Sequence, residues 1–264
     1  GLVLLGCGKM GSAMLQGWLA GGIDPAAVYI LDPNPSDWVK ARAAEGVHLN
    51  EALPAAPAIC IVAVKPQMMG DALPALQSLG GGATIFLSIA AGTPISMFEQ
   101  VFGAKTPIVR AMPNTPAAVG RGITALIGNA PAPQQDLDLS DGLLQAVGQT
   151  VRLASEDHMD AVTAVSGSGP AYVFHMIEAL AAAGEAEGLD AGLAMALAKA
   201  TVAGAGALAE AADEPPTQLR VNVTSPNGTT QAALEVLMDD DTGLPPLMRR
   251  AVKAAADRSR ELAK

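Results

Sequence analysis

Short apolar runs alternate with amphipathic helical patterns through the first half of the chain. The apolar runs lie at residues 2–5, 28–31, 59–64, 84–89 and 108–112. Helical patterns lie between them, at residues 10–20, 36–44, 67–79 and 95–102. Continuous apolar strands separated by helices predict a parallel sheet covered on both faces. A weaker pair of runs, 123–127 and 151–153, flanks a helical pattern at 134–147 and is expected to extend the sheet.

After about residue 155 the strand pattern stops and the chain reads as helices. They are expected at residues 156–165, 170–187, 191–212, 217–221, 229–238 and 247–262. Several are apolar on more than one face, as in the stretch AMALAKATVAGAGALA. Such helices need to be buried, and a domain of about a hundred residues has little interior to bury them. We therefore expect two domains, 1–154 and 155–264, and a dimer in which the helical halves of two copies interlock.

The amino-acid composition and the net charge limit which kinds of protein and partner are expected. Half of the 264 residues are hydrophobic and only 3% are aromatic, so small and aliphatic side chains fill the cores of a globular chain. The net charge of −10 argues against nucleic acid or an anionic membrane as a partner. The charge-free run at 161–177 is broken by SGSGP and is too short for a membrane helix. Cys7 and Cys60 form no disulfide framework, and we expect both to be buried and reduced in a soluble, cytoplasmic protein.

The first apolar run leads directly into the glycine pattern G-x-G-x-x-G in GCGKMG. In the dinucleotide-binding turn of this type, Gly6 allows the tight turn and Gly8 lets the backbone approach a pyrophosphate, while Gly11 lets helix and strand pack closely. The free N–H groups at the helix start bind the phosphates. We predict a Rossmann-type, doubly wound, mostly parallel sheet that binds a dinucleotide; a tight turn without a ligand is the alternative. The predicted coenzyme contacts here are Gly6, Cys7, Gly8, Lys9, Met10 and Gly11.

The second strand ends at Asp32, where an acidic residue commonly accepts from the adenosine ribose of NAD. Asn34 and Ser36 follow, and both could instead donate to the 2′-phosphate of NADP. Asp32 could equally be a turn residue in DPNPSD. The coenzyme is therefore left open between NADPH and NADH.

Ligands of open α/β sheets bind beyond the carboxyl ends of the strands, where AVKPQ, IAAGT and RAMPNTP should meet the glycine turn. Lys65 could reach a phosphate or ribose or lie in solvent. Asn114 and Thr115 could bind the nicotinamide carboxamide or the substrate, or form an Asx- or ST-turn. The predicted contacts in these loops are Asn50, Ala63, Val64, Lys65, Pro66, Ala90 and Asn114. The three histidines show no spacing typical of a metal site, so no metal is expected.

A nine-residue polar stretch, NVTSPNGTT at 222–230, interrupts the helical half. It predicts a loop that leads into a helix near Thr229, with Ser225, Thr229 or Thr230 as side-chain caps. The first N–H groups of that helix would be free to bind a small carboxylate. A capped helix without a ligand is the alternative. In SGSGP, Pro170 suits a helical first turn and Ser168 a cap position.

Together, these motifs carry a family resemblance. AVKP, RAMPNTP, AVSGSGPAYVF and NVTSPNGTT, in this order after the glycine turn, resemble pyrroline-5-carboxylate reductase over essentially the whole chain. The resemblance implies NADPH- or NADH-dependent reduction of 1-pyrroline-5-carboxylate to L-proline, the final step of proline biosynthesis. It also implies an all-α C-terminal dimerisation domain and a homodimer of interwoven helices, which in this family often assembles into a decamer.

The resemblance also implies roles for individual residues. Ser225, Gly228 and Thr229 hold the substrate carboxylate together with Thr230, whose hydroxyl lies near the ring nitrogen and is the catalytic group. Asn222 reaches the coenzyme. The family usually has two glycines after the proline of this motif, whereas here Asn227 precedes Gly228. Asparagine best replaces glycine at positive φ, so we expect the loop to keep its shape.

Other functions fit parts of the sequence. The chain could be another NAD(P)-dependent imine reductase, or an oxidoreductase similar to the β-hydroxyacid dehydrogenases. Those dehydrogenases carry a catalytic lysine and asparagine one turn apart, where this chain has Val173 and Ile177, so an alcohol–ketone reaction is disfavoured. A non-catalytic dinucleotide-binding protein would bind the coenzyme and consume none.

Overall fold

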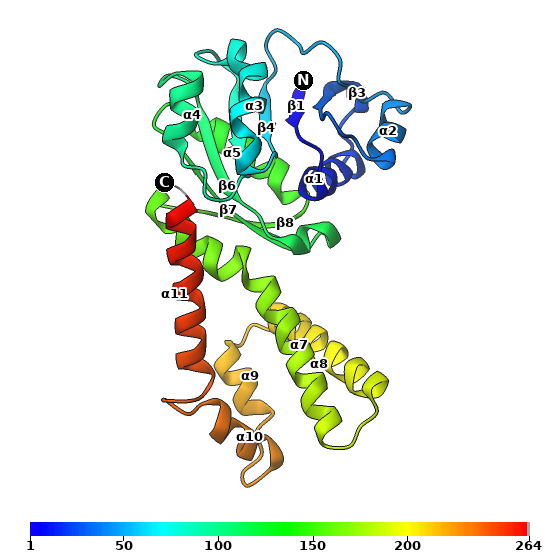
Figure 1. Ribbon diagram of the computed structural model, residues 1–264, viewed down its shortest axis with the longest axis vertical. Coiled ribbons are helices and arrows are strands. Elements are labelled where there is room, and N and C mark those ends of the chain that lie inside the picture. The colour runs from blue at the N-terminus through cyan, green and yellow to red at the C-terminus, as the bar shows by residue number, and fades with distance from the viewer. Residues whose placement is uncertain (263–264) are drawn as a thin grey trace. The chain divides into compact units, whose positions relative to one another are not determined.

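The computed structural model describes residues 1–262 (Figure 1). The chain forms two compact units. The first comprises Gly1–Gly167 together with the residues from Ala255 onward, and the second comprises Ser168–Ala254. Each unit is described separately below.

The first unit is built on an eight-stranded sheet with the order β3-β2-β1-β4-β5-β6-β7-β8. Its strands are β1 (Leu2–Leu5), β2 (Val28–Leu31), β3 (His48–Leu49), β4 (Ile59–Val62), β5 (Ile85–Ser88), β6 (Ile108–Met112), β7 (Gly122–Gly128) and β8 (Gly148–Arg152). The first six strands are parallel, β7 is antiparallel to β6, and β8 is parallel to β7. The chain leaves β1 in one direction for β2 and returns to its other side for β4, so the sheet is doubly wound. The predicted fold class is confirmed.

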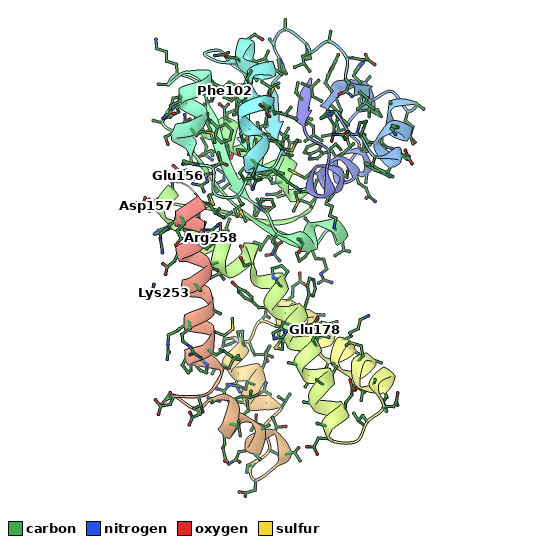
Figure 2. The ribbon with its side chains drawn as sticks, in the orientation of Figure 1. Phe102, Glu156, Asp157, Glu178, Lys253 and Arg258 are labelled. Atoms are coloured by element: carbon green, nitrogen blue, oxygen red, sulfur yellow. The ribbon has the colours of Figure 1, made fainter. Side chains whose placement is uncertain are left out.

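Helices cover both faces of this sheet (Figure 1). They are α1 (Lys9–Ala20), α2 (Asp37–Ala43), α3 (Met69–Ala72), α4 (Ile95–Phe102), α5 (Gln134–Gln145) and α6 (Met159–Val162). Alternate residues of β1 belong to different hydrophobic clusters: Leu4 shares one with Trp18 of α1, and Val3 shares the other with Phe102 of α4 (Phe102 is labelled in Figure 2). Because strand side chains alternate between faces, the continuous apolar runs of the sequence serve two cores.

A buried ion pair joins the sheet to the segment that leads into the helical half. Arg110 of β6 is almost fully buried, and its Nη1 donates to Glu156 Oε1 over 2.6 Å. The same oxygen accepts from the backbone N–H of Ile95 at the start of α4 (Glu156 is labelled in Figure 2). The end of the chain returns to this region, where Ser259 Oγ donates to Asp160 Oδ1 over 2.6 Å. These contacts explain why the last residues belong to the first unit.

Four local features differ from the sequence prediction. Residues 66–79 form two 3₁₀ segments around the single turn of α3, and not one helix, because Pro74 cannot donate a helical hydrogen bond. The two-residue β3 was missed because it is too short to show a pattern. β8 begins three residues earlier than expected, at Gly148. The last helix, α11 (Leu244–Leu262), starts three residues early because the prolines that follow Leu244 suit a helical first turn.

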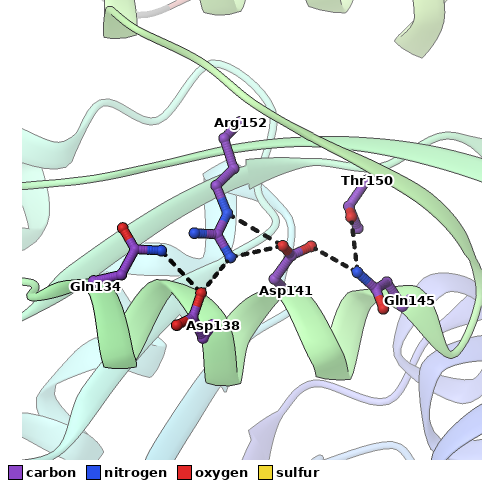
Figure 3. Close-up of polar contacts among 6 residues, drawn as sticks. All are labelled: Gln134, Asp138, Asp141, Gln145, Thr150 and Arg152. Atoms are coloured by element: carbon purple, nitrogen blue, oxygen red, sulfur yellow. Dashed lines mark hydrogen bonds and ion pairs between the residues drawn. The ribbon is translucent and has the colours of Figure 1, made fainter.

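A charged network fastens α5 to β8, the edge strand (Figure 3). Arg152 Nη2 donates to Asp138 Oδ1 over 2.7 Å and to Asp141 Oδ2 over 2.8 Å. The Arg152 hydrogen bond, with one from Gln134, lowers the pKa of Asp138 below its usual value. Partial burial raises the pKa of Asp141, but hydrogen bonds from Thr150, Arg152 and Gln145 and the charge of Arg152 outweigh it, so that this pKa is lowered too. The network favours both ionised carboxylates.

Replacing Arg152 by glutamine should lower the melting temperature at pH 7 by a few degrees at most, since the network is largely exposed. Both aspartates have folded-state pKa values below the reference value of 3.8. Their stabilisation is therefore present above that pH and is lost as pH falls through the folded values. Thermal unfolding of both proteins between pH 7 and pH 2 should show the difference disappearing in acid. Arg258→Gln is the control. It removes an exposed ion pair with Glu261 within α11 and should change the melting temperature little at any pH.

The second unit is entirely helical. It contains α7 (Gly169–Ala186), α8 (Ala191–Ala211), α9 (Pro216–Asn222), α10 (Thr229–Leu237) and the first part of α11. Among its described residues, the only fully buried hydrophobic side chains are Ala181, Ala194 and Ala198, where α7 packs on α8. Many large apolar side chains of these two helices are exposed, including Val173, Phe174, Met176, Leu180, Leu193, Met195, Leu197 and Leu208. A surface of this kind is typical of a protein–protein or membrane interaction site.

One helix in the described part of the chain, α8, is long and apolar enough to span a membrane by length and composition. A helix that is buried against a partner subunit has the same composition. The SGSGP segment begins within a π-helical turn, Thr163–Gly167, and Pro170 lies in the first turn of α7 as predicted. Ser168 occupies the cap position, but its side chain makes no capping hydrogen bond. Both cysteines are buried and unpaired, as predicted.

Candidate active site

The glycine turn after β1 has the geometry that the sequence predicts. Gly6 has φ +87°, and a Cβ there would lie 2.8 Å from Val64 Cγ1. A Cβ on Gly11 would lie 2.6 Å from the carbonyl oxygen of Gly6, so only glycine lets α1 pack this closely on the turn. A Cβ on Gly8 would meet no atom within 4 Å. The first and third glycines are therefore needed by the fold, whereas the second leaves backbone open to a ligand.

The start of α1 is able to bind an anion. Gly8 is the cap residue, so no side chain satisfies the first N–H groups, and the first turn carries no acidic residue. The first helical hydrogen bond runs from Ser12 N to Gly8 O over 2.8 Å. The N–H groups before Ser12 point out of the helix start, where a diphosphate would accept from them. These residues fit a dinucleotide.

The Asp32 carboxylate joins the end of β2 to the glycine turn. Its Oδ2 accepts from Cys7 N over 2.7 Å, and its Oδ1 accepts from Asn34 N over 2.8 Å. Asn50 fixes the same segment: its Oδ1 accepts from Asp32 N, and its Nδ2 donates to Asp32 O. Asn50 adopts φ +54° to make these bonds. Both groups of the Asn50 amide therefore serve the loop, and its predicted contact with the coenzyme stays a prediction.

A cavity of about 510 Å³ lies beside this turn. It is lined by Cys7, Gly8, Lys9, Ser12, Ala13, Gln16, Asp32, Asn34, Ser36, Trp38 and Ala118. Sequence reasoning missed Ser12, Ala13, Gln16, Trp38 and Ala118. Three of these could have been found, because positions 9, 12, 13 and 16 share one face of a helix. One wall of the cavity is therefore the exposed face of α1.

The remaining predicted coenzyme residues lie after the parallel strands of the first unit. Ala63, Val64, Lys65 and Pro66 follow β4, Ala90 follows β5, and Asn114 follows β6. Lys65 is exposed, whereas Ala90 is buried. The Asn114 amide is used within the unit: Nδ2 donates to Ser166 O over 3.2 Å and Oδ1 accepts from Ile123 N over 2.9 Å. Asn114 therefore anchors the π-helical turn, and its contact with the coenzyme stays a prediction.

In the second unit, the polar stretch forms a tight turn followed by a helix. Gly228 N donates to Ser225 O over 3.0 Å, which closes a turn with Pro226 and Asn227 at its centre. Asn227, the third of the four turn residues, has φ +58°. A type II turn requires a positive φ at this position. The expected replacement of glycine by asparagine at positive φ is confirmed. A Cβ on Gly228 would lie 3.0 Å from Ser225 O, so this glycine lets the turn close.

The start of α10 differs from the prediction in its cap. Gly228 is the cap residue, and no side chain accepts from the first turn, so neither Ser225 nor a threonine caps the helix. The first helical bond runs from Ala232 N to Gly228 O over 3.2 Å. The sequence prediction assigned the hydroxyls to capping because it could not place the turn relative to the helix axis. The structure instead leaves the donors of the helix start available to a small anion.

The predicted substrate residues gather around this helix start. Ser225 and Thr229 are exposed and Thr230 is half-buried, while Asn222 ends α9 and accepts from Gln218 Nε2 over 2.7 Å. Residues 222–230 contain no acidic side chain, so nothing in the stretch repels a carboxylate. No group of three side chains suited to a metal ion occurs within residues 1–262.

Two family models match the chain. Residues 156–262 match the pyrroline-5-carboxylate reductase dimerisation family, and residues 2–92 match the family described as NADP oxidoreductase, coenzyme F420-dependent. The pyrroline-5-carboxylate reductase of Pseudomonas aeruginosa is 37% identical to this chain, over 99% of this chain and 96% of the relative. The chain belongs to the pyrroline-5-carboxylate reductase family. The resemblance carried by the sequence motifs is confirmed.

Solved pyrroline-5-carboxylate reductases share the fold over the full length. The enzyme from Coxiella burnetii matches with a TM-score of 0.92 and 33% identity, covering 100% of this chain and 98% of that one. The Plasmodium falciparum pyrroline carboxylate reductase, solved with NADP bound, matches with a TM-score of 0.83 and 28% identity. The match covers 100% of this chain and 98% of that one. In this chain, the glycine turn lies on the first unit and the polar turn on the second.

Proposed function

We propose that this chain reduces the C=N bond of 1-pyrroline-5-carboxylate to give L-proline with NADPH or NADH, the last step of proline biosynthesis. The observation that carries the proposal is the uncapped start of α10 behind the Ser225–Gly228 turn, in a member of this family. It offers backbone donors and hydroxyls, without a competing acid, to a small ring that bears one carboxylate. The glycine turn of the first unit supplies the matching coenzyme cradle.

The chemistry needs little acid–base machinery from the protein. NAD(P)H supplies a hydride, which forms the new C–H bond at the imine carbon C5. The π electrons of the C=N bond move to the nitrogen, which either arrives protonated or takes a proton through Thr230 or water. The chain would bind the carboxylate and the coenzyme, and the positioning of two bound reactants contributes at most roughly 7–11 kcal/mol. No histidine or lysine is required as an acid.

The proposed roles follow the sequence expectations. Ser225, Gly228 and Thr229 bind the carboxylate, Thr230 acts at the ring nitrogen, and Asn222 contacts the coenzyme. The remaining coenzyme contacts are Gly6, Cys7, Gly8, Lys9, Met10, Gly11, Asp32, Asn34, Asn50, Ala63, Val64, Lys65, Pro66, Ala90 and Asn114. The domain boundary at 154/155 also stays a prediction: the dimerisation model begins at residue 156, whereas the first compact unit extends to Gly167.

Steady-state assays with both coenzymes test the function. Loss of NADPH or NADH absorbance on addition of pyrroline-5-carboxylate, with proline as the product, supports it. Coenzyme binding without turnover would instead indicate a non-catalytic dinucleotide-binding protein. Turnover of β-hydroxyacids alone would indicate a dehydrogenase, although Val173 and Ile177 supply no acid–base group for that reaction.

We also propose a homodimer formed through the helical unit, either on its own or assembled into a decamer, in the cytoplasm without nucleic acid or membrane. The exposed apolar side chains of α7 and α8 and the match of residues 156–262 to a dimerisation family support the dimer. Light scattering at micromolar concentration should give at least a dimer, and a monomer would contradict this. Phe174, which is 59% exposed, offers the variant: Phe174→Asp should weaken assembly because it places a charge in the interface. Leu139→Asp on α5 of the first unit is the control and should not.

A further inference from the structure

The cavity beside the glycine turn contains one cation that can distinguish the two nicotinamide coenzymes. We propose that Lys9 is a specificity-determining residue that binds the 2′-phosphate of NADPH, together with Asn34 and Ser36, and gives this chain a preference for NADPH. The proposal rests on the proposed function. It concerns the one difference between the coenzymes, a phosphate on the adenosine ribose.

Asp32 alone does not establish the usual selection for NADH. That selection depends on a carboxylate at the end of the second strand that accepts from the ribose hydroxyls. Here both oxygens of Asp32 already accept from backbone, one from Cys7 N over 2.7 Å and one from Asn34 N over 2.8 Å. The carboxylate is built into the loop, where it fixes the shape of the cavity wall. Each oxygen of Asp32 still has acceptor capacity for a ribose hydroxyl, so Asp32 by itself leaves the choice between the two coenzymes open.

Lys9 is the only cationic side chain among the residues that line the cavity. It is exposed at the first position of α1, and within residues 1–262 it forms no ion pair. Its positive charge offsets the negative charge of Asp32 in the same wall, so the lining has no net charge. In a chain of net charge −10, a dianionic phosphate needs such a local cation to bind.

Asn34 and Ser36, which follow β2, add donors to the lining of the same cavity. The Ser36 hydroxyl accepts from Val39 N over 3.3 Å as the cap of α2, which leaves its own proton free to donate. The Asn34 side-chain amide carries two further donors. An ammonium, an amide and a hydroxyl around one cavity suit the three oxygens of a phosphate monoester better than the hydroxyl of an unphosphorylated ribose.

Equilibrium binding tests the proposal without turnover. The chain has two tryptophans, and Trp18 is buried with its Nε1 bonded to Leu143 O, so Trp38 in the cavity wall reports binding by fluorescence. The probes are 2′-phospho-ADP-ribose and ADP-ribose, which differ only in the phosphate. The wild type should bind the phosphorylated probe more tightly. Lys9→Gln should lower the ratio of the two association constants about tenfold, as expected for the loss of one charge-assisted bond.

Two further variants separate a specific role from a general one. Lys9→Arg keeps the charge and should retain most of the preference. Lys105→Gln removes one charge at an exposed turn outside the cavity and should leave the ratio unchanged. An unchanged ratio in Lys9→Gln, or tighter binding of ADP-ribose by the wild type, would overturn the proposal, because Lys9 would then serve only the diphosphate common to both coenzymes.

The kinetic readout separates this proposal from the proposed function. The ratio of kcat/KM for NADPH to kcat/KM for NADH should exceed one in the wild type and fall about tenfold in Lys9→Gln. No turnover with either coenzyme would contradict the reductase function, and the binding ratio would still decide the role of Lys9. Turnover with an unchanged ratio would contradict the role of Lys9 alone.

Discussion

Replacing Gly11 by alanine should cost both stability and coenzyme binding, whereas the same replacement at Gly8 should cost coenzyme binding alone. The added Cβ at Gly11 would lie 2.6 Å from the carbonyl oxygen of Gly6, which is held in a turn at φ +87°. Backbone at such a turn cannot move without displacing β1, so we expect a loss of about 1–3 kcal/mol, as for other overpacked sites. At Gly8 the Cβ would meet no protein atom within 4 Å. There the methyl group fits the fold but occupies the approach of the diphosphate.

Two measurements separate the variants. Thermal unfolding without ligand should show a lower melting temperature for Gly11→Ala and an unchanged one for Gly8→Ala. Titration with coenzyme should show weaker binding for both, by roughly 10–100-fold at Gly8 if one or two hydrogen bonds to a charged phosphate are lost. Normal coenzyme affinity in Gly8→Ala would mean that the diphosphate does not approach this turn. Equal melting temperatures would mean that the close contact between Gly11 and Gly6 does not limit the fold.

The glycine turn and the sheet could be predicted because they depend on local sequence. Val3 and Leu4 point to opposite faces and are both fully buried, so every residue of the run had to be apolar. The positive φ of Asn227 was predictable for the same reason, since few residue types adopt it and the neighbouring proline marks a turn. In these places the backbone conformation restricts the residue type directly.

The polar contacts of the site were not predictable, because their partners are distant in sequence. Asn50 and Asp32 are 18 residues apart and form two hydrogen bonds with each other. Asn114 reaches Ser166, 52 residues further along the chain. An asparagine in a loop shows from sequence only that it has donors and acceptors. Which loop it meets depends on the packing of the whole unit, so an amide predicted to face the coenzyme can instead hold two loops together.

The helical unit was only partly predictable from one chain. Composition indicated helices that are apolar on several faces, and the structure shows such helices with Phe174 59% and Leu208 56% exposed. The apolar sequence pattern predicts that these helix faces are buried in the assembled protein. It does not predict the surface against which they are buried, because that surface depends on how two copies of the chain pack together.

Replacing Thr230 by valine should lower kcat/KM for pyrroline-5-carboxylate by roughly 10–100-fold, as expected for the loss of a hydrogen bond to a charged group. Valine has nearly the same shape and the same β-branch, so the start of α10 should persist. Thr230 is half-buried at the second position of a helix whose first turn has no side-chain cap, so its hydroxyl serves no structural bond there. Coenzyme affinity should hold, because Thr230 is not among the proposed coenzyme contacts.

The way in which kcat/KM falls distinguishes two roles for the hydroxyl. A lower kcat at constant KM indicates an interaction made in the transition state, as expected at the ring nitrogen, whereas a higher KM alone indicates carboxylate binding. Thr230→Ser should recover most of the activity because it keeps the hydroxyl. Thr217→Val makes the same change at an exposed position in the first turn of α9 and should leave kinetics unaltered. If Thr230→Val were as active as the wild type, protonation would have to come from water or from a substrate that binds already protonated, and the uncapped helix start would act on the carboxylate alone.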